Sequence, residues 1–260
     1  MAAISQDLLK AYYSNKDLSG DEKFVQEVTE AIVSFQKALP HDHPFREDVS
    51  TLKRFLIARR FVIADAHTML DAHVVWRSKT LPIEMSHSLL EDLKLAKYYG
   101  YGKDLNGGPA FVVRSGRFNP KGPNARHLET AVHAVVYITE QLLKDTTADS
   151  FSVLYDRADF SISENFDLEL IKAVNKVMAD NYPERLTGAY VFPSGIVLRQ
   201  LYKIVSPFLD PRTRTKIHML PSHKDLAQYF DVSTLEECYG GHGTFDPETA
   251  YPSVANGKES

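Results

Sequence analysis

The chain has 260 residues, of which 43% are hydrophobic and 25% are charged, a composition typical of ordinary globular proteins. Its net charge of −4 argues against a general nucleic-acid-binding protein. The single cysteine, Cys238, excludes a framework of internal disulfides and favours a reducing compartment.

The distribution of apolar residues indicates a protein without a membrane-spanning segment. The first residues, MAAISQDLLKAYY, lack the basic segment and apolar run of a signal peptide. No stretch reaches the roughly 18 consecutive apolar residues of a membrane-spanning helix. We therefore expect a cytoplasmic protein, and we expect the mostly polar residues 1–20 to be a flexible N-terminus.

Residues 21–92 have the pattern of a helical lobe. Ser19 and Glu22 have the spacing of a capping box, and Pro40 ends the helix that they begin. Its apolar side consists of Phe24, Val28, Ala31, Ile32, Phe35 and Leu39. The next segment, HDHPF at 41–45, offers two histidines but no clear third metal ligand, so we expect a linker there.

Two further helices complete this lobe. The first is short, and either Asp48 or Ser50 is placed to cap it. The second runs from Ile63 to about Lys79. His73 lies on the apolar side of the second helix, so we expect a residue at the edge of the core rather than a metal ligand.

From about Lys94 the pattern changes to strands and turns. Tyrosines alternate with Gly100 and Gly102, a turn DLNGGP follows at 104–109, and AFVVRS at 110–115 predicts a strand. The two glycines are not a dinucleotide fingerprint, because they precede a strand and lack a third glycine. The sequence also lacks a P-loop and the G-x-S-x-G turn of hydrolases.

Helices and strands then alternate, which predicts an α/β sheet with right-handed crossovers. Asn124 and Ser163 are placed to cap two helices, the second of which runs to Asn181. Strands are expected at 151–156, 187–193 and 217–220. A short helix, SHKDLAQYF, precedes a YGG turn. Beyond Phe245 the composition turns to Pro, Gly, Ser and charge, so we expect residues 246–260 to be a flexible tail.

The segment Ile196–Leu209 predicts a helix that is apolar on two sides. Its polar stripe is narrow and consists of Arg199, Gln200, Lys203 and Ser206. The helix is shorter than the roughly 20 residues that span a bilayer. It is either a central core helix or a helix that contacts an apolar ligand. The cations and hydroxyl that follow, at 212–216, suit a ligand with an apolar body and an anionic head.

Four motifs together resemble the Sec14-like (CRAL-TRIO) phosphatidylinositol transfer protein family. They are LKRFLIARRFVIADAHTMLDAHVVWR at 52–77, YPERL at 182–186, PFLDPRTRTKI at 207–217 and YGG at 239–241. The resemblance implies an α/β fold in which the helical lobe, 21–92, precedes a CRAL-TRIO lipid-binding domain at 93–245. That domain would have a mixed β-sheet floor and a gating helix that swings at a membrane. The implied gate residues are Leu198, Leu201, Tyr202, Val205, Phe208 and Leu209.

The resemblance also implies a site for the headgroup of phosphatidylinositol. Its residues would be Arg59, Arg60, Asp104, Pro109, Glu184, Thr213 and Lys216. A threonine and a lysine at the start of a helix suit a phosphate, and the acids and arginine can hydrogen-bond inositol hydroxyls. The alternative is that Glu184 forms an exposed ion pair with Lys216 or Arg185, which would contribute little.

The implied acyl-chain pocket departs from the choline-lipid site of the family. Its residues would be Phe111, Phe151, Val153, Tyr155, Tyr190 and Phe192. The serine and threonine of the choline site fall at Phe151 and Val153, and its two tyrosines fall at Phe111 and Gly100. The lost hydroxyls make a phosphatidylcholine ligand doubtful, so we expect a different second ligand, such as a sterol or another hydrophobic lipid.

The implied function is lipid binding and transfer without covalent chemistry. The partners would be phosphatidylinositol, another hydrophobic lipid and, transiently, a membrane surface, with no nucleic acid. We expect no cofactor apart from the bound phospholipid, and a monomer that associates peripherally with membranes. The alternatives are an adaptor that senses lipid without transferring it and a small-molecule enzyme. No spacing of Asp156, Asp159 and His133 supports the enzyme.

Overall fold

The computed structural model describes residues 4–13, 18, 20–120, 128–144 and 148–251. The chain forms two compact units. The helical unit comprises Met1–Pro82 and Val177–Glu184, and the sheet unit comprises Ile83–Lys176 and Arg185–Ser260. The first boundary between the units lies between Pro82 and Ile83, before the expected position near residue 92. Helix α5 (His87–Lys94) belongs to the sheet unit because it packs on α6 (Leu128–Lys144) of that unit.

The helical unit is built from α1 (Gln6–Tyr13), α2 (Glu22–Ala38), α3 (Val49–Ala58) and α4 (Ile63–Thr80). The carboxylate of Asp21 caps α2 by accepting from Phe24 N, whereas Ser19 lies outside the described residues. Asp48, not Ser50, caps α3 by accepting from Thr51 N. Helices α2, α3 and α4 bury their predicted apolar sides in one core.

The N-terminal residues are in part a packed helix, which differs from the expected flexible segment. Ile4 is buried in the core of the helical unit. In α1, the ring of Tyr12 stacks on Phe24 with centroids 5.1 Å apart, and the hydroxyl of Tyr13 donates to Ile57 O. Polar composition alone does not reveal these apolar contacts, because they come from residues distant in the sequence.

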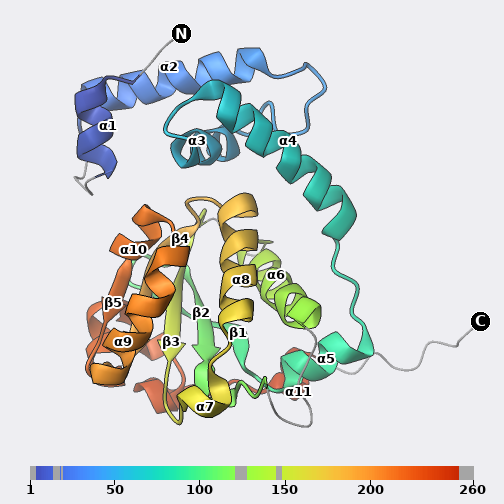
Figure 1. Ribbon diagram of the computed structural model, residues 1–260, viewed down its shortest axis with the longest axis vertical. Coiled ribbons are helices and arrows are strands. Elements are labelled where there is room, and N and C mark those ends of the chain that lie inside the picture. Colours follow the sequence, from blue (N-terminus) through green and yellow to red (C-terminus); the bar gives the residue numbers. More distant parts are fainter. Residues whose placement is uncertain (1–3, 14–17, 19, 121–127, 145–147, 252–260) are drawn as a thin grey trace, which may run out of the picture. The chain divides into compact units, whose positions relative to one another are not determined.

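The sheet unit contains a mixed six-stranded sheet, as predicted (Figure 1). Its strands are β1 (Tyr98–Asp104), β2 (Pro109–Arg114), β3 (Phe151–Asp156), β4 (Leu186–Phe192), β5 (Ile217–Met219) and β6 (Phe230–Asp231). The spatial order is β5-β4-β3-β2-β1-β6. Strands β2 to β5 are parallel, whereas β1 pairs antiparallel with both β2 and β6.

Helices connect the parallel strands and cover one face of the sheet, the helix-covered face (Figure 1). They are α6 (Leu128–Lys144), α7 (Ile162–Asn165), α8 (Leu168–Asn181), α9 (Ile196–Val205) and α10 (Pro211–Thr215). The predicted cap Asn124 lies outside the described residues. Ser163 is not a cap, because it lies inside α7; instead, Asp167 accepts from Leu170 N at the start of α8.

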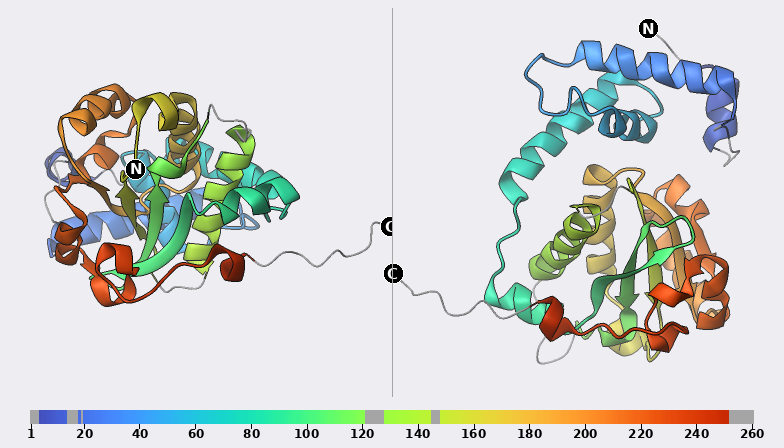
Figure 2. Two further views of the ribbon diagram at one scale, coloured as in Figure 1. Left: turned by 90° about the horizontal axis from the view of Figure 1, so that it is seen from below. Right: turned by 180° about the vertical axis from the view of Figure 1, so that it is seen from behind.

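Residues 220–245 pack on the opposite face, the C-terminal face (Figure 2). They form short 3₁₀ helices at His223–Gln228, Val232–Thr234 and Glu237–Tyr239, and two further 3₁₀ turns lie at Ser115–Arg117 and Ser206–Phe208. The predicted short helix SHKDLAQYF is therefore a 3₁₀ helix, closed by a capping box between Ser222 and Asp225.

Residues 246–251, the described part of the expected flexible tail, are packed on the sheet unit. Residues Pro247–Ala250 form α11, whose Glu248 pairs with Lys94 of α5. The ring of Tyr251 lies 6.1 Å from that of Phe245 and 6.4 Å from that of Tyr137. In the described part of the chain, no helix combines the length and apolar character needed to cross a membrane.

Candidate functional site

The two faces of the sheet differ in how completely their side chains are covered. On the C-terminal face, Ala110 and Leu154 are 0% exposed. On the helix-covered face, Phe111 and Phe151 are also buried, but Val113, Val153 and Tyr155 of the same central strands are only half-buried. Strands with elements on both faces normally bury both sets of side chains. The helix-covered face therefore keeps apolar surface that an apolar ligand could cover.

The helices over this face pack on it unequally. Helix α6 buries an apolar side against β1 and β2. By contrast, only Asn181 is buried among the residues of α8, and its apolar stripe is half-buried throughout. The members of that stripe are Leu170, Ile171, Val174, Val177 and Met178. A helix with an apolar stripe that no side chain fully covers is unusual unless another molecule covers it.

Helix α9 is apolar on two sides, as its sequence predicts. Leu198 and Leu201 point inward and are 8% and 7% exposed. Ile196, Val197 and Ile204 are 78%, 48% and 49% exposed. The alternative that this segment is a central core helix is therefore wrong.

The remaining predicted gate residues surround the end of α9. Tyr202 and Val205 are half-buried, and Leu209 is buried. The chain tightens after Val205 into the 3₁₀ turn Ser206–Phe208, because Pro207 cannot donate a helical hydrogen bond. The Phe208 ring is exposed, and Lys172 Nζ of α8 lies 4.3 Å from its centroid. This cation–π contact joins α8 to the end of the predicted gate.

The turn after the predicted gate places a lysine beside the start of β4. Asp210 caps α10 by accepting from Arg212 N at 2.8 Å, with Pro211 as the first helical residue. Thr213 is half-buried within α10. Lys216 follows the helix, and its Nζ donates to Leu186 O at 2.7 Å. The ammonium is thus held in a defined place.

Asp104 organises the DLNGGP turn. Its Oδ1 accepts from Asn106 N and Gly108 N, both at 2.9 Å, and its Oδ2 accepts from Ser152 Oγ at 2.7 Å. These bonds give Asp104 a structural role in the turn that ends at Pro109. Its predicted contact with a headgroup stays a prediction.

The predicted headgroup residues are divided between the units. Arg59, Arg60 and Glu184 belong to the helical unit, and the other four belong to the sheet unit. Arg59 is the C-cap of α3, and Arg60 lies over the Tyr13 ring at 5.3 Å. Arg60 and Glu184 both have left-handed backbones, with φ of 51° and 59°. This conformation costs each about 1 to 2 kcal/mol.

The six predicted acyl-pocket residues do not share one face. The parallel register pairs Leu154 with Tyr190 and Asp156 with Phe192. Tyr190 and Phe192 therefore lie in the core of the C-terminal face with Leu154. The other four alternate with these positions and belong to the helix-covered face: Phe111, Phe151, Val153 and Tyr155. The error arose because the sequence shows alternation within a strand but not the register between strands.

Gly100 explains one departure from the choline-lipid pattern. A Cβ added there would lie 2.6 Å from Leu142 Cδ2 of α6, so a side chain at this position would require the Leu142 side chain to shift. Phe111 and Phe151 pack edge to face, with centroids 6.2 Å apart, in the place of hydroxyl-bearing residues. Both observations agree with an apolar rather than a choline-binding surface.

Sequence reasoning missed a buried polar network that holds the YGG turn on the sheet. Glu236 accepts from Tyr99 OH at 2.5 Å and from Arg114 Nη2 at 3.1 Å. Tyr239 OH donates to Asp156 Oδ2 at 2.9 Å and accepts from Arg114 Nε at 3.0 Å. Burial raises the pKa of both tyrosines well above the ordinary range. No spacing in the sequence could have revealed this polar network, because its members come from β1, β2, β3 and the C-terminal segment.

Comparison with known proteins agrees with this architecture. The family described as CRAL/TRIO domain matches residues 93–241. A solved structure described as Sfh5 is similar over 88% of this chain and 91% of that chain, with a TM-score of 0.66 and 19% identity. At that identity the likeness concerns the fold alone.

Two relatives from Arabidopsis thaliana are named phosphatidylinositol/phosphatidylcholine transfer proteins. SFH9 is 28% identical over 246 residues, which are 85% of this chain and 41% of the relative. SFH4 is 27% identical over 240 residues, which are 81% of this chain and 38% of the relative. The chain thus spans about two fifths of the length of these relatives. Because the family match covers more than half of the chain, this protein belongs to the CRAL/TRIO domain family.

Proposed function

We propose that this chain binds one phospholipid, phosphatidylinositol in the first place, against the helix-covered face and exchanges it between membranes. The observation that carries the proposal is helix α9, which is buried through Leu198 and Leu201 and exposes Ile196 and Ile204. Such a helix can cover an apolar ligand with one side and contact lipid with the other. Acyl chains left in water would cost about 0.8 kcal/mol per CH₂.

The headgroup would be held by the residues that the family resemblance implies. Lys216 supports this assignment because its ammonium is fixed beside the start of β4, next to a short helix that carries Thr213. A cation and a hydroxyl together suit a phosphate. The names of the relatives SFH9 and SFH4 also support phosphatidylinositol as the ligand.

We further propose that the second ligand is a hydrophobic lipid other than phosphatidylcholine. Phe111, Phe151 and Val153 offer no hydroxyl to a choline phosphate, and Gly100 has no side chain to offer one. Mass spectrometry of lipids that co-purify with the protein tests this directly. Abundant phosphatidylcholine at a stoichiometry near that of phosphatidylinositol would contradict it.

A transfer assay between two populations of vesicles tests the proposed function. We expect Arg59→Ala with Lys216→Ala to lower phosphatidylinositol transfer at least roughly ten-fold, because two charge-assisted contacts are lost. The matched control is Lys37→Ala with Lys224→Ala, which removes one exposed lysine from each unit. Unchanged transfer by the first, correctly folded pair would defeat the headgroup assignment. Tight lipid binding without any transfer by the unaltered protein would instead indicate the adaptor.

A further inference from the structure

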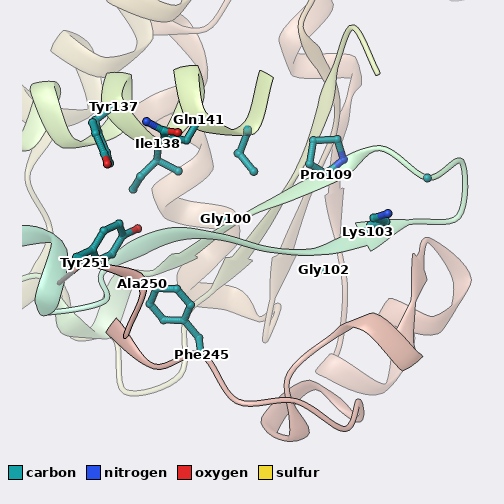
Figure 3. Close-up of a pocket in the computed structure, with 12 residues that line it drawn as sticks. Gly100, Gly102, Lys103, Pro109, Tyr137, Ile138, Gln141, Phe245, Ala250 and Tyr251 are labelled. Carbon is teal, nitrogen blue, oxygen red and sulfur yellow. The ribbon is translucent and has the colours of Figure 1, made fainter. Parts of the chain in front are cut away.

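A pocket of about 420 Å³ lies at the outer edge of β1, within the sheet unit (Figure 3). Its lining includes none of the predicted gate or acyl-chain residues. It shares Pro109 with the predicted headgroup set and Gly100 with one tyrosine position of the family's choline-lipid site. Its volume falls in the range of sites for small molecules, roughly 300 to 1,000 Å³. The proposed lipid function leaves this pocket without a role.

Three elements enclose the pocket. Helix α6 supplies one wall through Tyr137 and Gln141, and the C-terminal segment supplies the opposite wall through Phe245 and Tyr251 (Figure 3). Strand β1 supplies the floor, where glycine at position 100 leaves the backbone uncovered by a side chain of its own.

The floor also offers backbone hydrogen-bonding groups. Arg114 N donates to Lys97 O, so this pair is a hydrogen-bonded pair of the antiparallel ladder. Hydrogen-bonded and non-hydrogen-bonded pairs alternate along such a ladder, so the pair of Gly100 with Phe111 is non-hydrogen-bonded. The N–H and C=O of Gly100 therefore point away from β2. On that outer side, β6 pairs only with Lys103 and Asp104 among the described residues. A ligand in the pocket would therefore meet a strand edge at its base.

The side chains of the pocket define the chemistry of a ligand. Three aromatic rings lie at one end of the pocket. The centroid of the Tyr251 ring lies 6.4 Å from that of Tyr137 and 6.1 Å from that of Phe245. Pro109 and Lys103 lie toward the other end (Figure 3). Among the described residues that line the pocket, Lys103 is the only charged one. The aromatic end suits an apolar ring, and the cation suits an anionic group.

We propose that this pocket is a second ligand site, for a small amphipathic anion that has a ring-containing apolar body and one acidic group. The ring system lies against Tyr137, Phe245 and Tyr251, and the acidic group reaches Lys103. The backbone of Gly100 orients the ligand through the strand edge. This site works independently of the lipid on the helix-covered face.

Two fluorescent probes with the same ring body test the proposal. They are 1-anilinonaphthalene-8-sulfonate, which is an anion, and N-phenyl-1-naphthylamine, its uncharged counterpart. The protein is first saturated with phosphatidylinositol, so that the lipid surface is occupied. We expect the anion to bind about two- to five-fold more tightly than the neutral probe, and Lys103→Ala to abolish this difference.

Filling the pocket provides the second arm of the test. We expect Gln141→Phe to weaken both probes about ten-fold or more while phosphatidylinositol transfer continues. Glu129→Phe on the same helix, at a side chain that is 83% exposed and outside the pocket, should leave both affinities unchanged. Equal probe binding by the Gln141→Phe variant and the unaltered protein would overturn the proposal. Displacement of phosphatidylinositol by the probe would overturn it as well, because the pocket would then belong to the lipid site.

Discussion

At the scale of single residues, the polar network around Arg114 is held by several buried contacts. Its guanidinium lies between the rings of Tyr99 and Tyr239, at 5.3 and 5.5 Å from their centroids. Glu236 is 4% exposed and Asp156 is 9% exposed, so each carboxylate needs the donors that it has. The network fixes the C-terminal segment to the sheet rather than a ligand to the protein.

The network makes stability sensitive to alkaline pH. Burial raises the pKa of Tyr99 and Tyr239 above the ordinary value of 10.0, so above that pH the unfolded chain loses these protons first. The free energy of unfolding should therefore fall as pH rises past about 10, by about 1.4 kcal/mol per pH unit for each tyrosine. Urea unfolding between pH 8 and 11 measures this slope. The double variant Tyr99→Phe with Tyr239→Phe should show a shallower dependence of the unfolding free energy on pH. An unaltered slope would contradict the assignment of this dependence to the two tyrosines.

Gly241 of the YGG turn has no room for a side chain. An added Cβ would lie 2.0 Å from Leu235 O and 2.5 Å from Val232 O, both on the backbone. We expect Gly241→Ala to lower the free energy of unfolding by about 1 to 3 kcal/mol, the usual cost of overpacking. Chemical denaturation measures the change. Gly20→Ala, where an added Cβ meets nothing within 4 Å, serves as the control and should change stability little.

At the scale of elements, α9 shows how one helix can serve two apolar surroundings. Its inward side contributes to the fold through the buried Leu198 and Leu201, whereas Ile196 and Ile204 on its outward side remain 78% and 49% exposed. A charge on the outward side should therefore spare folding and disturb contact with a membrane. Leu201→Asp would not separate these effects, because Leu201 is buried.

The exposed side of α9 gives a direct test of membrane contact. We expect Ile196→Asp with Ile204→Asp to change the free energy of unfolding by no more than about 0.5 kcal/mol each. Lipid exchange should slow roughly ten-fold or more, because two carboxylates would enter an apolar layer. Vesicle transfer kinetics measure the effect. Ile162→Asp, 48% exposed on α7, is the control; equal slowing by that variant would remove the special role of α9.

At the scale of the whole molecule, the chain order does not follow the two units. Residues 177–184 come late in the sequence but belong to the helical unit. There, Asn181 Oδ1 contacts His73 Nδ1 at 3.1 Å, and the Tyr182 ring packs against Trp76 at 5.8 Å. His73 is thus a buried core residue, deeper than its expected place at the core edge. The YPER motif accordingly begins in one unit and ends in the other.

The proposed lipid surface of the sheet unit depends on the assembled fold. Val153 lies half-buried on the helix-covered face of a central strand. We expect Val153→Trp to occupy apolar surface meant for lipid and to reduce bound phospholipid to about half or less. Native mass spectrometry of the purified protein measures the bound fraction. Val25→Trp on the exposed side of α2 is the control, and full lipid occupancy in the Val153 variant would refute this placement.

The sequence by itself determined the features that depend on neighbouring residues. The helical periodicity of α2 and α4, the strand at 151–156 and the two apolar sides of α9 all follow from local spacing. The motifs in the YPERL and PFLDPRTRTKI segments also indicated the family. Local spacing is sufficient here because a helix or strand orients its side chains by its own geometry.

Only the tertiary structure decided which side chains share a face. Register placed Tyr190 and Phe192 behind the sheet, away from Val153. Long-range packing brought Glu236 to Arg114 and assembled the edge pocket from β1, α6 and α11. These outcomes depend on contacts between residues that are far apart in the sequence. Glu236 and Arg114, for example, are more than a hundred positions apart, and no local periodicity relates them. Such contacts are selected by the total burial of the fold rather than by any one segment.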